Sequence, residues 1–264
     1  KGENLNNKKI LIISEQGIGD NIQFFRYLFS LKKNYQCEII FYTDKNIQHL
    51  FRSSPFKIVT DLKSQEKIDY FQNLLSLPGI FYKKNKFIQG PINYINIENE
   101  KNLFWKNKLK KFNKPIIALN WQGSKDFLFD YERSINLIKF KNILNIDKYN
   151  FISLQKNYGS EQINKYNLST YIHDLSNEID LNENAFEDTI SILNNINLLI
   201  TTDTAIAHLA GTMGIKTYLL LSYNPEWRWL IEIEHKCFYP NLNIIQQTKI
   251  NDWRDVFLKL EKIL

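Results

Sequence analysis

The chain has 264 residues, of which 44% are hydrophobic and 14% aromatic, enough for one large or two small domains with a sizeable core. No apolar run approaches the roughly 20 residues that span a bilayer, and the polar residues 1–9 do not fit a secretory signal peptide. We therefore expect a cytoplasmic protein without a transmembrane segment. Its net charge of +6 leaves open a peripheral contact with the inner face of a membrane.

The basic charge does not by itself specify a nucleic-acid partner. Lysines cluster at 83–86 and 106–111, but no RNA-binding or zinc-finger signature accompanies them, so we expect no nucleic-acid partner. The two cysteines, Cys37 and Cys237, fit no metal-ligand spacing, and we expect reduced thiols and no metal site. The chain begins with lysine and its only methionine is Met213, which suggests a piece of a longer protein.

The first half of the chain shows alternating strand and helix patterns. Residues 9–14 form a continuous β-branched run that predicts a buried parallel strand, and a glycine turn at 15–20 leads into a helix at 21–33. The elements expected next are a strand at 38–42, a short helix at 47–51, a strand at 57–60, a loop at 73–79 and a basic amphipathic helix at 101–112. This order predicts a parallel sheet with right-handed crossovers.

The same order begins again after residue 113. The elements expected there are strands at 115–120, 150–154, 171–172, 198–200 and 218–221, and helices at 185–195 and 252–264. We therefore predict an α/β chain with two Rossmann-like domains, at 1–112 and 113–250, whose parallel sheets face a cleft. The C-terminal helix, at 251–264, is expected to pack back on the N-terminal domain.

The most informative motif runs from 202 to 211, between two apolar strands. Asp203 or Thr204 can cap the following helix, whose open amide groups and dipole favour an anion. His208 lies one turn after Thr204, and both can share a face of the helix. In open α/β sheets, ligands bind at the carboxyl ends of the strands, where this motif lies.

Three other polar loops follow predicted strands. The first contains Gly17, Gly19 and Asp20, and its glycines allow close approach to a ligand. It is a poor dinucleotide fingerprint, because the third glycine of the pattern is absent. The loops at 120–134 and 153–159 supply polar and cationic groups for a phosphate or a nucleotide base, namely Gln122, Gly123, Lys125, Arg133, Gln155 and Lys156. Each loop alone also fits an ordinary surface turn, but together they point to one crevice.

At this point the motifs resemble a known family. Residues 203–214 are similar to the Asp-Ser/Thr-x-x-x-His-Leu-Ala signature of the heptosyltransferase-like glycosyltransferases, family 9 with the GT-B fold. The set looks closest to the glycosyltransferase domain that follows tetratricopeptide repeats in bacterial proteins. The other matching stretches are 15–20 with Phe24, Arg26 and Tyr27, then 75–78, 121–123, 133–134, 153–156 and 227–229.

The resemblance implies an inverting, metal-independent glycosyltransferase with an N-terminal acceptor domain and a C-terminal donor-nucleotide domain. Asp20 occupies the place of the family's proposed base, and a carboxylate there can take the proton of an attacking hydroxyl. Glu15, Gln16 and Arg26 are then expected on the acceptor side. The residues expected at the donor and its phosphates are Gly19, Gln122, Gly123, Lys125, Arg133, Gln155, Lys156, Asp203, Thr204, Ala205 and His208.

The implied partners are a nucleotide-diphosphate sugar as co-substrate, with no cofactor, and a glycan, lipopolysaccharide-type or protein acceptor. Tetratricopeptide repeats upstream in the full chain are a further expectation. Two alternatives stay open: a sugar-nucleotide epimerase or hydrolase on the same fold, and a non-catalytic sugar-nucleotide-binding module. The sequence leaves the donor sugar, the nucleotide base and the acceptor unassigned.

Overall fold

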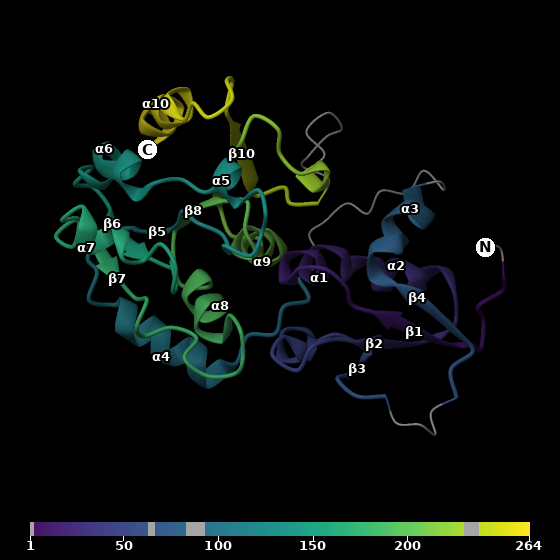
Figure 1. Cartoon of the computed structure of the whole chain (residues 1–264). Helices are drawn as coiled ribbons and strands as arrows, with labels where there is room; N and C mark the ends of the chain where they lie inside the picture. The colour runs from purple at the N-terminus through teal and green to yellow at the C-terminus, as the bar shows by residue number, and fades with distance from the viewer. Residues whose placement is uncertain (1–2, 63–66, 83–92, 230–237) are drawn as a thin grey trace.

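The computed structural model describes residues 3–62, 67–82, 93–229 and 238–264, and it contains two parallel sheets (Figure 1). The first sheet has the order β3-β2-β1-β4 and the second the order β10-β9-β8-β5-β6-β7. The strands are β1 (Lys9–Ile13), β2 (Glu38–Tyr42), β3 (Lys57–Val59), β4 (Tyr70–Asn73), β5 (Ile116–Asn120), β6 (Asn150–Ser153), β7 (Ile172–Asp174), β8 (Leu198–Thr202), β9 (Thr217–Leu221) and β10 (Leu242–Gln246).

The α-helices and short 3-10 segments (η) connect these strands. They are α1 (Ile18–Phe24), α2 (Arg26–Asn34), η1 (Gln48–Phe51), η2 (Leu74–Ser76), α3 (Leu77–Tyr82), α4 (Asn99–Leu109), α5 (Asp130–Arg133), η3 (Leu137–Phe140), α6 (Lys141–Leu144), α7 (Gln162–Lys165), α8 (Glu187–Leu193), α9 (Ala205–Met213), η4 (Trp227–Trp229) and α10 (Arg254–Ile263). The expected helix at 21–33 is thus two helices that meet at Phe25. The expected loop at 73–79 contains η2 and the start of α3.

The central strands of the second sheet are buried on both faces. All five residues of β5, β8 and β9 are buried, as expected for parallel strands covered by helices on each side. Alternate residues point to opposite faces, so Ile117 and Leu119 join one core cluster and Ile116 and Ala118 the other. The cluster that contains Ile116 and Ala118 is continuous with the core of the first half, and it also contains α9 side chains such as Leu209.

Two helices pack differently from the sequence prediction. The C-terminal helix α10 was expected on the N-terminal domain, but Phe257 and Leu260 join the core of the second half, where the Phe257 ring lies 4.8 Å from Phe140. Figure 1 shows α10 beside α6, on the far side of the second sheet from the first half. Helix α4 falls within the predicted domain 1–112, yet it packs on α8 of the second half, where the Trp105 indole donates to Asp188.

The strand order explains where polar loops meet. In the first sheet the order reverses between β1 and β4, and in the second between β5 and β8. At such a reversal the loops leaving the two strands diverge to opposite faces and leave a crevice at their carboxyl ends. Residues after β1, β5 and β8 therefore occupy the two crevices.

Candidate functional site

A cavity of about 1010 Å³ lies between the two halves, at the carboxyl ends of both sheets. Its size is in the range of sites for small ligands. Of the fifteen residues that the sequence assigned to the site, only Glu15 and Arg26 are absent from its described walls. The thirteen that line it are Gln16, Gly19, Asp20, Gln122, Gly123, Lys125, Arg133, Gln155, Lys156, Asp203, Thr204, Ala205 and His208.

Asn120, at the end of β5, links three loops of the second half. Its amide donates to Gln155 Oε1 at 2.9 Å, and its Oδ1 accepts the hydroxyls of Thr204 at 2.9 Å and Thr201 at 3.2 Å. Gln155 is only 3% exposed, and it also bonds the backbone of Gln122 through both ends of its amide. Gln155, expected to meet a ligand, thus lines the cavity and also holds the loops in place. Asn120 begins the polar loop at 120–134, but no role was predicted for it, because nothing local in the sequence marks its contacts with the other loops.

The N-terminus of α9 opens into the cavity without a side-chain cap. Thr204 occupies the N-cap position, but its hydroxyl donates to Asn120 rather than accepting from the helix. The Thr204 carbonyl accepts the Ala207 amide at 3.0 Å, but the Thr204 side chain caps neither of the two preceding amides, those of Ala205 and Ile206. Because the helix dipole also favours negative charge there, the amide of Ala205 lies at a place suited to an anion.

Arg133 lies next to that helix start. Its Nη1 donates to the carbonyl of Asp203 at 2.9 Å and its Nε to Asp130 Oδ1 at 2.9 Å. Gly123 is required beside it, because a Cβ there would lie 2.4 Å from Arg133 Nη2. The guanidinium is thereby fixed in the wall of the cavity, where planar recognition of phosphate oxygens needs it.

The two lysines that were predicted to bind the donor phosphates differ in the contacts that they already make within the protein. Lys125 Nζ lies 3.3 Å from the centre of the Tyr158 ring, a cation–π contact that leaves its hydrogens free for an anion. Lys156 donates to the carbonyl of Asp180 and joins the loop after β6 to the loop before α8. The structure thus gives Lys156 a loop-anchoring role beside its place in the wall.

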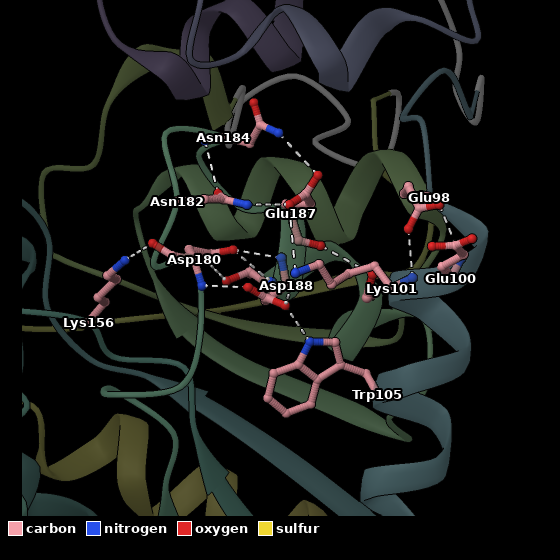
Figure 2. Close-up of polar contacts among 12 residues, drawn as sticks. Glu98, Glu100, Lys101, Trp105, Lys156, Asp180, Asn182, Asn184, Glu187 and Asp188 are labelled. Carbon is pink, nitrogen blue, oxygen red and sulfur yellow. Dashed lines mark hydrogen bonds and ion pairs between the residues drawn. The ribbon is translucent and has the colours of Figure 1, made fainter.

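The loop before α8 forms the far end of the cavity and is fixed by reciprocal bonds (Figure 2). The Asp188 amide donates to Asp180 Oδ1 at 2.7 Å, and the Asp180 amide donates to Asp188 Oδ2 at 2.8 Å. Burial raises the pKa of Asp180, and the bond from Thr189 opposes that change. Phe186, the last wall residue before α8, has φ +68°, an uncommon conformation for a bulky side chain. No feature of the sequence predicted this strained position.

Asp20 faces the cavity from α1, where it occupies the third helical position after the N-cap Gly17. Its Oδ2 accepts the amide of Gly17 at 3.1 Å, and its Oδ1 lies 2.8 Å from Arg228 Nη1. Burial raises the pKa of Asp20, and the positive charge of Arg228 lowers it in part. A carboxyl with a raised pKa is suited to accept a proton near neutral pH.

His208 is packed more tightly than a ligand contact requires. It is 3% exposed, its ring stacks on Trp229 at 4.6 Å between centres, and its Nδ1 lies 3.1 Å from the Tyr239 hydroxyl. A Cβ on Gly19 would lie 2.9 Å from the His208 ring, so the glycine lets α1 pack directly on α9. Burial, reinforced by Arg228 and a second arginine, lowers the pKa of His208 well below its usual value, so its ring is neutral.

The two predicted residues outside the cavity have structural contacts. Glu15 accepts from the Asn73 amide and the Leu75 backbone, so it fixes the loop after β4. Arg26 is 2% exposed and donates to the carbonyl of Phe238 at 2.9 Å. Arg26 was expected on the acceptor side; it lies in the first half, but residues of the second half cover its guanidinium.

Two absences concern the described residues. Among residues 3–62, 67–82, 93–229 and 238–264, no group of three His, Cys, Asp or Glu side chains could hold a metal ion. In the same part of the chain, no helix is long and apolar enough to cross a membrane.

Comparison with known proteins supports the fold. Scanning protein-family models and searching curated proteins gave no match. A family 9 glycosyltransferase from Veillonella parvula superposes with a TM-score of 0.66 at 12% identity, over 98% of this chain and 93% of that chain. E. coli ADP-heptose LPS heptosyltransferase II superposes with a TM-score of 0.57 at 10% identity, over 97% of this chain and 98% of that chain. E. coli heptosyltransferase WaaC with ADP-2-deoxy-2-fluoro heptose superposes with a TM-score of 0.57 at 6% identity, over 97% of this chain and 100% of that chain.

These likenesses extend over nearly the whole chain and both sheets, although the identities are low. They confirm the predicted architecture of two Rossmann-like sheets that face a cleft. The protein therefore has the GT-B fold of the family 9 glycosyltransferases.

Proposed function

We propose that the protein is an inverting glycosyltransferase that moves a sugar from a nucleotide-diphosphate donor to a hydroxyl acceptor. One observation carries this proposal: Asp20, from the first half, and the open N-terminus of α9, from the second, line one cavity. Gly19 brings them together, since a Cβ on it would lie 3.5 Å from the Ala205 Cα. A proton acceptor thus lies beside a site for negative charge, as transfer from a diphosphate requires.

The chemistry divides between the two halves. The acceptor oxygen attacks the anomeric carbon and forms the new bond as its proton passes to the Asp20 carboxylate. The bond from that carbon to the diphosphate oxygen breaks, and its electron pair leaves on the nucleoside diphosphate. Attack opposite the leaving group inverts the configuration. The α9 amides, Arg133 and Lys125 stabilise the departing charge, so the reaction needs no metal ion.

The heptosyltransferase structures suggest the first donors to test, because their described ligands include ADP-heptose analogues. A thermal-shift screen of ADP-, UDP-, GDP- and dTDP-sugars identifies the nucleotide, since a ligand that binds the folded protein raises its melting temperature. The acceptor is a glycan, a lipopolysaccharide-type molecule or a protein, and tetratricopeptide repeats earlier in the full chain are proposed to present it.

The decisive experiment is Asp20→Asn, with transfer and nucleotide binding measured on the same protein. We expect transfer to fall by about 100-fold or more, since general-base catalysis contributes about that much, while the thermal shift with nucleotide persists. The control is Asp147→Asn, whose side chain is 98% exposed and should leave both readouts unchanged. Full transfer by the Asp20 variant would refute the role of this carboxylate.

A further inference from the structure

The tripeptide Trp227–Trp229, which forms η4, crosses the boundary between the two halves. Trp227 stacks on Phe24 of α1 at 5.9 Å between ring centres, with an interplanar angle of 12°. Trp229 is buried and stacks on the α9 histidine. These two rings fix the backbone between them, so the position of Arg228 is set by both halves.

The backbone of Arg228 is also held from the first half. Gln23 Nε2 donates to its carbonyl at 3.1 Å, a contact between residues 205 positions apart. The side chain then reaches Asp20, with Nη1 2.8 Å from Oδ1, while Nη2 lies 3.7 Å from Glu226. The Arg228 side chain is 21% exposed and that of Asp20 9%, so water screens their attraction only in part.

We propose that Arg228 is a positioning residue for Asp20: it reaches across from the second half of the chain, forms an ion pair with one carboxylate oxygen and favours the ionised form of the group before the acceptor binds. The other oxygen is held by the Gly17 amide, so the carboxylate cannot turn freely. An arginine suits this place because its guanidinium stays charged at every relevant pH. This inference rests on the proposed function of Asp20 as a base.

The other charges near Asp20 do not replace Arg228. Glu226, from the same segment, opposes ionisation of Asp20 because it carries like charge. His208, which packs against Gly19, is neutral because burial lowers its pKa. Among the described residues, Arg228 is therefore the cation that offsets part of the cost of burying this carboxylate.

The test is a direct titration of Asp20 by NMR, in protein whose aspartate carboxyl carbons are isotope-labelled. The resonance of Asp20 is identified as the signal that is missing from the spectrum of the Asp20→Asn variant. In Arg228→Gln we expect the measured pKa of Asp20 to rise by about one pH unit or more, as for a carboxylate that loses an adjacent cation. Arg228→Lys keeps a positive charge at this position, so it should reverse at least half of that rise in the pKa of Asp20. The control Arg254→Gln removes an exposed arginine and should leave the resonance unchanged.

Circular dichroism shows whether each variant is folded, and Arg228→Met replaces the glutamine variant if that one is not. An unchanged Asp20 pKa in the folded neutral variant overturns the proposal. It is overturned equally if that variant binds ADP less tightly while the pKa stays the same, because Arg228 would then be a phosphate ligand. The titration needs no sugar transfer, so its failure is distinguishable from failure of the proposed function, which Asp20→Asn activity decides.

Discussion

The two halves of the chain meet at two ends of the cavity, and the ends are built differently. One, here called the packed end, brings Gly19, Phe24 and Arg26 against His208, Trp227–Trp229, Phe238 and Tyr239. The other, called the polar end, brings Lys45 and Asn46 against Glu183 and Ala185. The packed end buries aromatic rings and one guanidinium. The polar end has a backbone bond from Ala185 to Asn46 at 2.9 Å and an exposed ion pair.

This difference indicates where the halves separate at least cost. Parting the packed end exposes apolar ring surface, which is unfavourable in proportion to its area. At the polar end, water replaces one backbone partner and screens the ion pair, and both changes are nearly neutral. The cavity should therefore open toward the polar end, with the packed end as the fixed side.

The largest expected effect is at Trp229, which is 3% exposed. Trp229→Ala should lower the free energy of unfolding by about 3–5 kcal/mol, as for other buried aromatic truncations. Its control within the same tripeptide is Trp227→Ala, where the side chain is 58% exposed and the loss should be below about 1 kcal/mol. Urea titration measures both. A loss for Trp229→Ala as small as that expected for Trp227→Ala would mean that the packed end is not held by Trp229.

An intermediate effect is expected at Gly211, inside α9. A Cβ there would lie 2.5 Å from the Tyr239 ring, which is buried and cannot move aside. Gly211→Ala should cost about 1–3 kcal/mol by overpacking. Gly79, in α3, has nothing within 4 Å of its Cβ position, and Gly79→Ala should be neutral or slightly stabilising, since alanine favours helix. If Gly211→Ala leaves the free energy of unfolding unchanged, the packed end accommodates an added methyl group without cost.

The smallest effect is expected at the polar end. Lys45 Nζ lies 3.3 Å from Glu183 Oε2, with side-chain exposures of 77% and 86%. Lys45→Gln should change the free energy of unfolding by less than about 1 kcal/mol, the usual limit for exposed pairs. The measurement is a urea titration at low and high salt. A loss as large as that at Gly211 would contradict the contrast between the two ends.

The sequence predicted most of the fold because its signals are local. Continuous β-branched runs such as 9–14 and 115–120 marked buried parallel strands. Parallel strands of one sheet bring their carboxyl ends to one edge, so the loops after β5, β6 and β8 were expected together. The structure places them, with the loop after β1, around one cavity. Helix boundaries were less certain, because the break at Phe25 leaves no proline or glycine to mark it.

The errors arose where a contact joins distant parts of the chain. Arginine is a residue type that often binds ligands, but the partner of Arg26, Phe238, lies 212 positions later and covers it. Helix α10 has an apolar face that fits any complementary surface, and only the position of α6 and β10 decided which one it covers. A long-range partner leaves no trace in the local pattern, so neither outcome was predictable.

For this protein, the sequence alone determined the order of most strands and helices along each half, the polar loops at the strand ends and the glycine turn at 15–20. These follow from hydrophobic periodicity and backbone freedom, which act within a few residues. The tertiary structure alone decided that Arg228 faces Asp20, that Lys156 anchors a loop and that His208 is buried and neutral. Charge and burial depend on neighbours from both halves, and the fold alone brings those neighbours together.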